Sequence, residues 1–305
     1  MLFQLPTLDQ AIYRVMRLRR LIAVAVAVPF ITLLLVSTMN PAILPATEAS
    51  LAILGVSALI VTHAILFPNV TLETLSLSFA ATALIVLMPL LSSLALWAPV
   101  EQQSGAFALL VLFAVAVAGV LVVLLHIGLG AIAYAGPVLS RVLHLQQALP
   151  CSTDAAFQQL ALRPATRRGR VLTGQADENG FFDVAVALAS PEGGADHVRV
   201  DAKVLTSSPQ RHDVMLLTRA GAMTVTSLGF SETQGGCIVD VRDMPGDFTL
   251  GMYALFWLTD QQADNLTEMT DALFGRAPRA NGLAHHGSLM SFAGAILSPR
   301  TPMVD

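Results

Sequence analysis

The first half of this chain is almost free of charged side chains. Between Leu21 and Ala135 the only acidic or basic residues are Glu48, Glu73 and Glu101. They separate four apolar segments, which lie near residues 21–39, 49–67, 75–98 and 106–134. Each has about 20 or more largely apolar residues, which is the length that crosses a hydrocarbon core of roughly 30 Å as an α-helix. The sequence therefore predicts a membrane α-helical bundle of four transmembrane helices.

The arginines before the first apolar segment predict the topology. Arg14, Arg17, Arg19 and Arg20 precede it, and Arg141 follows the last segment, whereas the loops between segments contain no Lys or Arg. A basic start also occurs in secretion signals, but this apolar run is longer than theirs and further spans follow, so we expect an anchor. The positive-inside bias places the N-terminus in the cytoplasm. Four crossings predict a multi-pass inner-membrane protein with both termini cytoplasmic.

Two histidines lie within the predicted spans, His63 and His126. Imidazoles on two facing helices can bind a haem or a chlorin, which makes this pair a candidate cofactor site. The alternative is that each imidazole hydrogen-bonds a neighbouring helix. The glycines of the last span, Gly119 and Gly128 among them, are interpreted as small residues for close helix packing. The sequence identifies no specific cofactor.

The second half has a different composition and excludes some classes of function. Residues 136–305 contain 13 Lys and Arg against 17 Asp and Glu, which accounts for the formal net charge of −4. This mildly acidic balance contains no basic stripe, so we expect no nucleic-acid partner. Cys151 and Cys237 lack the spacing of metal ligands, and His285 and His286 point apart on any regular element, so we expect no metal site.

The periodicity of the second half predicts a run of antiparallel strands. In residues 197–205, Val198, Val200 and Val204 alternate with charged residues, as in a half-buried strand. Further strands are predicted at 141–150, 168–174, 181–189, 212–218, 222–230 and 237–244. Their short connections join antiparallel neighbours and predict a meander. Asp183 and Asp240 interrupt these strands at positions that alternation assigns to the solvent face.

Two helices flank the strands. Residues 152–162 predict a short helix capped by Ser152 or Thr153. Residues 259–275 predict a long amphipathic helix, with Thr259 and Gln262 as its capping box and Gly275 as a left-handed C-cap. The predicted organisation is a cytoplasmic segment (1–20), a transmembrane domain (21–135), a linker (136–140), an α+β domain (141–276) and a C-terminal tail (277–305).

This order of strand, short helix, antiparallel strands and C-terminal helix resembles the helix-grip fold of the SRPBCC superfamily, which includes START and Bet v 1-like proteins. The phrases ALPCSTDAAFQQL and FWLTDQQADNLTEMTDALFG carry the resemblance, which covers about residues 140–276. The family's paired short helices are compressed here, and the four spans lie outside it. The resemblance implies a curved antiparallel sheet gripping a long C-terminal helix, with an apolar cavity for a lipid or another hydrophobic molecule.

The resemblance implies ligand-binding residues on both walls of that cavity. The expected residues are Val198, Val200 and Val204 on the sheet and Leu266, Met269 and Leu273 on the helix. The alternative is that these side chains fill a core without a cavity. No catalytic constellation is found, so an enzyme is not the expected class.

Three functions follow from these observations. The first is a membrane protein whose cytoplasmic SRPBCC-like domain binds an apolar small molecule or lipid beside the bilayer. The second is a non-catalytic subunit or assembly factor of a larger membrane complex. The third is a haem- or chlorin-binding membrane protein that uses His63 and His126.

Overall fold

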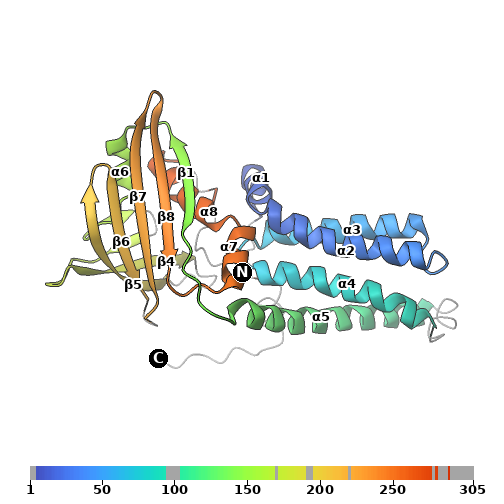
Figure 1. Ribbon diagram of the computed structural model, residues 1–305. Coiled ribbons are helices and arrows are strands. Elements are labelled where there is room, and N and C mark those ends of the chain that lie inside the picture. Colours follow the sequence, from blue (N-terminus) through green and yellow to red (C-terminus); the bar gives the residue numbers. More distant parts are fainter. Residues whose placement is uncertain are drawn as a thin grey trace. The chain divides into compact units, whose positions relative to one another are not determined.

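The computed structural model describes residues 5–93, 104–168, 171–189, 195–218, 221–276, 279–280 and 288. They fall into a helical unit, Leu5–Ile132, and an α+β unit that begins at Ala133 (Figure 1). The predicted linker 136–140 belongs to the start of the α+β unit. Almost all of the predicted tail 277–305, including His285 and His286, lies outside the described residues.

The helical unit is built from one amphipathic helix, the first, and four largely apolar helices. They are α1 (Leu8–Arg17), α2 (Arg19–Met39), α3 (Ala46–Leu66), α4 (Thr71–Ser93) and α5 (Ser104–Tyr134). Among the described residues, three helices are long and apolar enough to span a membrane: Arg19–Met39, Ala46–Leu66 and Leu112–Tyr134. The described side chains of α4 form a shorter apolar stretch, Thr71–Leu87. The described residues therefore show three of the four predicted spans as membrane-length apolar helices, and the fourth stays a prediction.

The first helix revises the interpretation of the N-terminal arginines. Residues 1–20 were predicted only as a cytoplasmic segment, yet α1 is a regular helix with a capping box at Thr7. Arg14 and Arg17 are buried in the helical unit. Arg14 Nη1 donates to the carbonyl oxygen of Ile65 at 2.6 Å, and Arg17 Nη1 lies 3.4 Å from Asn69 Oδ1. These two arginines therefore hold α1 against the α3–α4 turn.

The α+β unit contains one antiparallel sheet of eight strands. In spatial order the strands are β1-β8-β7-β6-β5-β4-β3-β2, so β2 to β8 form a meander and β1 returns beside β8 (Figure 1). The strands are β1 (Leu143–Leu149), β2 (Arg167–Arg168), β3 (Val171–Thr173), β4 (Phe181–Ala189), β5 (Ala195–Ser208), β6 (Arg211–Leu217), β7 (Met223–Thr233) and β8 (Gly236–Pro245). The meander predicted from alternation is confirmed.

Local chemistry explains how the sheet turns and bends. Before β4, the Asp177 carboxylate accepts hydrogen bonds from the backbone N–H groups of Asn179 and Phe181. Along β5, the register with β6 shifts between Val204 and Thr206. This bulge breaks the alternation, so that Ser207 pairs with His212 across the strands.

Three helices complete the unit: α6 (Thr153–Leu160), α7 (Leu250–Leu258) and α8 (Gln261–Leu273). Ser152 caps α6 as predicted, because its Oγ accepts from the Ala155 N–H at 3.3 Å. The predicted helix over 259–275 corresponds to α8, which begins two residues later and is separated from α7 by a break in the chain. Asp260 takes a left-handed conformation there, with φ +50°.

The predicted capping box at Thr259 does not form, because Asp260 takes the N-cap position of α8 and makes no side-chain cap hydrogen bond. Thr259 ends α7 instead, and its Oγ1 donates back to the carbonyl oxygen of Leu255 at 2.9 Å. A threonine hydroxyl can accept a hydrogen bond from a backbone N–H group at a helix start, or donate one to a carbonyl oxygen of the preceding turn. The Thr259 hydroxyl makes the second kind of hydrogen bond, within α7. Gly275 has φ +60° after α8, as the predicted left-handed C-cap requires.

The inward face of the sheet carries two apolar clusters. The first joins β1, β7 and β8 to α6 and α8, with Leu160, Phe230, Val239 and Leu266 among its buried members. The second lies on β4, β5 and β6 and contains Phe182, Val184, Ala202 and Val214. Because α6 and α8 both pack in the first cluster, the helices fill one half of the inward face.

Candidate functional site

A pocket of ≈480 Å³ opens at the second half of the inward face. Its walls come from β4, β5 and β6 and from the segments that flank β2 and β3. The lining residues are Arg163, Pro164, Ala176, Gly180, Phe182, Val204, Ser207 and His212. The wall thus combines an apolar floor with a few polar groups, which is the usual character of small-molecule sites.

His212 is the central polar group of this wall. It is almost fully buried, with Nε2 2.8 Å from the carbonyl oxygen of Leu162 and Nδ1 3.2 Å from Ser207 Oγ. A carbonyl oxygen can only accept, so Nε2 carries the proton, and a neutral ring then accepts the Ser207 hydroxyl at Nδ1. Burial lowers the pKa of His212, and the nearby positive charges of Arg163 and Arg168 lower it further. The imidazole is therefore a neutral group in a fixed orientation.

Aromatic and cationic groups surround His212. The ring of Phe157 on α6 meets it edge to face, with 5.9 Å between the ring centroids. The guanidinium carbon of Arg163 lies 5.4 Å from the centroid of the same Phe157 ring. Arg163 follows α6 directly, so the end of this helix positions both Arg163 and the carbonyl oxygen that fixes His212. The pocket is positively charged at this end.

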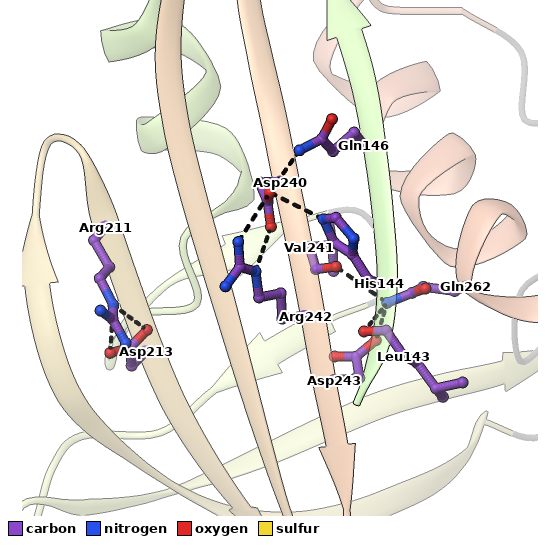
Figure 2. A network of polar contacts seen from close by, with 10 residues as sticks. All are labelled: Leu143, His144, Gln146, Arg211, Asp213, Asp240, Val241, Arg242, Asp243 and Gln262. Atoms are coloured by element: carbon purple, nitrogen blue, oxygen red, sulfur yellow. Dashed lines mark hydrogen bonds and ion pairs between the residues drawn. The ribbon is translucent and has the colours of Figure 1, made fainter. Parts of the chain in front are cut away.

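A second polar group lies at the opposite end of the sheet, where Asp243 faces α8. Thr226 Oγ1 donates to Asp243 Oδ1 at 2.7 Å. Gln262 Nε2 donates to Asp243 Oδ2 at 2.9 Å (Figure 2). Burial raises the pKa of Asp243, and these two hydrogen bonds partly offset that effect. Gln262 also lies 3.4 Å from the carbonyl oxygens of Leu143 and Val241. Asp243 and Gln262 therefore fasten the first turn of α8 to the ends of β1 and β8.

Figure 2 also shows a polar cluster around Asp240, on the outer face of β8. Asp240 accepts from Arg242 Nε at 2.9 Å and Gln146 Nε2 at 2.8 Å, and it lies 3.0 Å from His144 Nε2. The Arg242 guanidinium, with smaller contributions from Gln146 and His144, holds the pKa of Asp240 well below its usual range. Asp240 alternates with inward-facing Val239 and Val241, so it lies on the face that the sequence assigned to it.

The structure separates the predicted ligand-binding residues into three groups. Val204 lines the pocket, and Val200 packs in the apolar cluster beside it. Leu266 and Leu273 belong to the core that α8 fills against β1, β7 and β8. Val198 and Met269 are 41% and 36% exposed. The pocket thus lies beneath the segments around β2 and β3, whereas the resemblance implied a cavity beneath the C-terminal helix.

The two predicted haem or chlorin ligands have different surroundings in the helical unit. His63 is buried, with Nε2 3.0 Å from Glu73 Oε1 and Nδ1 3.0 Å from Thr74 Oγ1. Both ring nitrogens are thus engaged by α4, as in the helix-to-helix alternative. His126 Nδ1 is buried without a hydrogen-bond partner among the described residues. No group of three or more His, Cys, Asp or Glu side chains suited to a metal occurs in the described part of the chain.

Sequence reasoning missed Arg163, His212 and Asp243. Asp243 carried a usable signal, because it has the same parity along β8 as Val239 and Val241 and so had to face inward. His212 had the same parity as Val214 along β6, although its Ser207 partner depends on the bulge in β5. Arg163 gave no signal, since it lies outside any periodic element.

Comparisons with known proteins give limited information. No protein-family model matches the chain. No curated protein matches it. Similar solved structures include protein MLL2253 from Mesorhizobium loti, at 11% identity and a TM-score of 0.32, over 44% of this chain and 97% of that one.

Two further structures have the same level of similarity. The protein encoded by gene BPP1335 from Bordetella parapertussis has 15% identity and a TM-score of 0.35, over 48% of this chain and 81% of that one. The di-domain ARO/CYC StfQ from the steffimycin biosynthetic pathway has 10% identity and a TM-score of 0.34, over 56% and 60%. Similarities at these TM-scores carry no inference about function, and the likeness to SRPBCC proteins is one of element order.

Proposed function

We propose that this chain is a multi-pass membrane protein whose SRPBCC-like α+β domain binds an apolar small molecule or lipid beside the bilayer. The observation that carries the proposal is the ≈480 Å³ pocket on the inward face of the sheet. Ligand pockets usually measure about 300–1,000 Å³ and have mostly apolar walls with a few placed polar groups. The pocket has this size and character, with Phe182 and Val204 as apolar wall and His212 as polar wall.

The start of the α+β unit supports the membrane part of the proposal. This unit begins with Ala133, in the last turn of α5, and the Ala133 carbonyl oxygen accepts a hydrogen bond from Thr249 Oγ1. The following linker packs on α7, since the Tyr253 hydroxyl donates to the carbonyl oxygens of Leu139 and Arg141 at 3.1 and 2.9 Å. A pocket tethered so briefly to a membrane-length helix would meet membrane-soluble molecules at high effective concentration.

Localisation of both termini in the cytoplasm is part of the proposal and depends on α4. This helix has 23 residues, enough for about 34 Å at 1.5 Å per residue, so it is long enough to be a fourth span. A cysteine introduced by Gly235→Cys, in the exposed β7–β8 hairpin, reports the side of the membrane. We expect an impermeant maleimide to label this cysteine only after the cells are opened. Labelling in intact cells would place the α+β unit outside, which a chain with a cytoplasmic N-terminus reaches after three crossings of the membrane.

A matched pair of substitutions tests ligand binding. Val204→Phe places a larger side chain in the pocket, and Val198→Phe makes the same change on the same strand, at a residue that does not line it. The full-length proteins are purified in mild detergent, and extracted small molecules are quantified by mass spectrometry. We expect an apolar molecule to accompany the parent and Val198→Phe, and to fall by about 10-fold in Val204→Phe, since losing part of an apolar contact costs about 1–2 kcal/mol.

The proposal fails if no apolar molecule accompanies the parent, or if both phenylalanine variants retain it equally. Folding of each variant is checked by protease resistance, because overfilling a packed site can cost about 1–3 kcal/mol. A variant that resists protease like the parent but carries no ligand locates binding at the pocket.

A second candidate, a subunit or assembly factor of a larger complex, is favoured by α5. Almost none of the membrane-length part of α5, Leu112–Tyr134, is buried, with Ala133 as the exception. In the described part of the chain, no atom lies within 4 Å of an ideal Cβ at Gly119 or Gly128, so these glycines pack against no helix here. Size-exclusion chromatography with light scattering tests this candidate, which predicts a stable assembly lost on Gly119→Leu.

A further inference from the structure

Two arginines beside the pocket are held by the end of α6. Arg163 lines the pocket, and its Nη2 donates to the Gln158 carbonyl oxygen at 3.0 Å and to the Gln158 side-chain oxygen. Arg168 Nη1 donates to the Gln159 carbonyl oxygen at 2.8 Å. The last carbonyl groups of a helix lack intrahelical partners and carry partial negative charge, so they are natural anchors for cations. Each guanidinium is thereby fixed in place.

These anchors leave donors unused. Arg163 Nε and Arg168 Nη2 are buried and have no hydrogen-bond partner among the described residues. A buried charged donor without a partner costs at least about 1–3 kcal/mol. The two charges also repel each other, since burial and the neighbouring Arg163 lower the pKa of Arg168 to about 10. The fold therefore maintains two close cations at a net cost.

Three other arginines of the domain pair with carboxylates. Arg211 Nε lies 2.9 Å from Asp213 Oδ2, and Arg242 Nε lies 2.9 Å from Asp240 Oδ1 (Figure 2). Arg279 Nη2 lies 2.6 Å from Asp271 Oδ1. By contrast, no ion pair between described residues involves Arg163 or Arg168. The positive charge at the pocket is therefore available to a ligand.

We propose that the ligand of this pocket is amphipathic and carries an anionic group, a phosphate or a carboxylate, which Arg163 binds. The proposal rests on the apolar-ligand function above and names the chemical class of that ligand. The apolar part contacts Phe182 and Val204, while the anion accepts from the Arg163 guanidinium at the pocket wall, with Arg168 adding positive potential. The single N–H group of neutral His212 donates to the Leu162 carbonyl oxygen, so it is not free to bind the anion. The hydrogen-bond donors for the anion therefore come from arginine.

Binding of three probes to the full-length protein tests the proposal. The protein is placed in nanodiscs of phosphatidylcholine, with empty nanodiscs as the blank, and the probes are hexadecyl phosphate, hexadecanol and inorganic phosphate. Arg163→Gln removes the charge and the fork of donors. Arg167→Gln is the matched control, because Arg167 is exposed and does not line the pocket.

We expect hexadecyl phosphate to bind the parent at least about 10-fold more tightly than hexadecanol, the ratio that one charge-assisted hydrogen bond supplies. Arg163→Gln should remove this preference by weakening hexadecyl phosphate binding more than hexadecanol binding, whereas Arg167→Gln should alter both by less than about 2-fold. Arg163→Lys, which keeps the charge without the fork, should recover part of the preference. Protease resistance of each variant separates lost binding from lost folding.

Each contrary result has a distinct meaning. Equal binding of hexadecyl phosphate and hexadecanol, unchanged in Arg163→Gln, overturns the anionic group and leaves the apolar-ligand function standing. Absence of binding by both long-chain probes overturns that function together with the present proposal. Inorganic phosphate that binds as tightly as hexadecyl phosphate overturns the amphipathic ligand, because the site then takes a free anion.

Discussion

Replacing Leu266 by alanine tests whether α8 fills the space against the sheet. Leu266 is 1% exposed and packs among side chains of β1, β7, β8 and α6. The substitution removes about three carbon groups at about 0.8 kcal/mol each. The remaining void adds about 24 cal/mol per Å³, or about 1 kcal/mol for a void of about 50 Å³. We therefore expect a loss of about 3–4 kcal/mol, a large part of the 5–15 kcal/mol typical of a domain.

Pulse proteolysis in urea measures this loss in the full-length protein, because it reports the fraction of the domain that is open to cleavage. Met269→Ala is the matched control on the same helix, since Met269 is 36% exposed and should cost less than about 1 kcal/mol. If Leu266→Ala costs no more than Met269→Ala, the space between α8 and the sheet is an open cavity and the packing argument is refuted.

Two further predictions concern the β7–β8 hairpin and Asp243. Gly236 has φ +148°, and an ideal Cβ there would clash with the Leu149 carbonyl oxygen, so Gly236→Ala should cost about 2 kcal/mol or more in urea unfolding. Gly235→Ala, whose Cβ would meet nothing within 4 Å, should stay within about 0.5 kcal/mol, and equal effects would contradict this account. Because the folded-state pKa of Asp243 is raised, its contribution to stability is lost as pH rises above about 3.8 through the folded-state pKa. The stability of Asp243→Asn relative to the parent should therefore increase from pH 4 to pH 7, and an equal difference at both pH values would show that Asp243 is not buried as a raised-pKa acid.

The periodicity of the sequence was enough to predict most of the α+β fold. Period-two alternation located the strands, because one face of the sheet is buried and the other is solvated. Ser152 and Gly275 marked a helix start and a helix end, since both act through their own backbone and the adjacent turn. In the membrane half, length and apolarity predicted helices, but they did not establish the number of crossings.

The predicted capping box at Thr259 did not form, because two hydrogen-bonding arrangements compete for the same hydroxyl group. Thr259 satisfied the pattern of a helix start, yet its hydroxyl returns to the carbonyl oxygen of Leu255 and ends α7. Gln262, the expected partner in that capping box, instead reaches Asp243 on β8. Both outcomes depend on where α7 and the sheet edge lie, which a local pattern does not contain.

The sequence by itself determined which segments avoid water and which form strands, because those properties depend on residues a few positions apart. Only the tertiary structure decided where the pocket lies and which charges face it. The sequence separates Arg163 from His212 by almost 50 residues, and the pairing of Ser207 with His212 depends on the bulge in β5. The end of α6 and the curve of the sheet bring these residues together at the pocket. A binding site depends on such long-range contacts. Local sequence patterns therefore do not identify its residues, even where the same patterns predict the strands on which they lie.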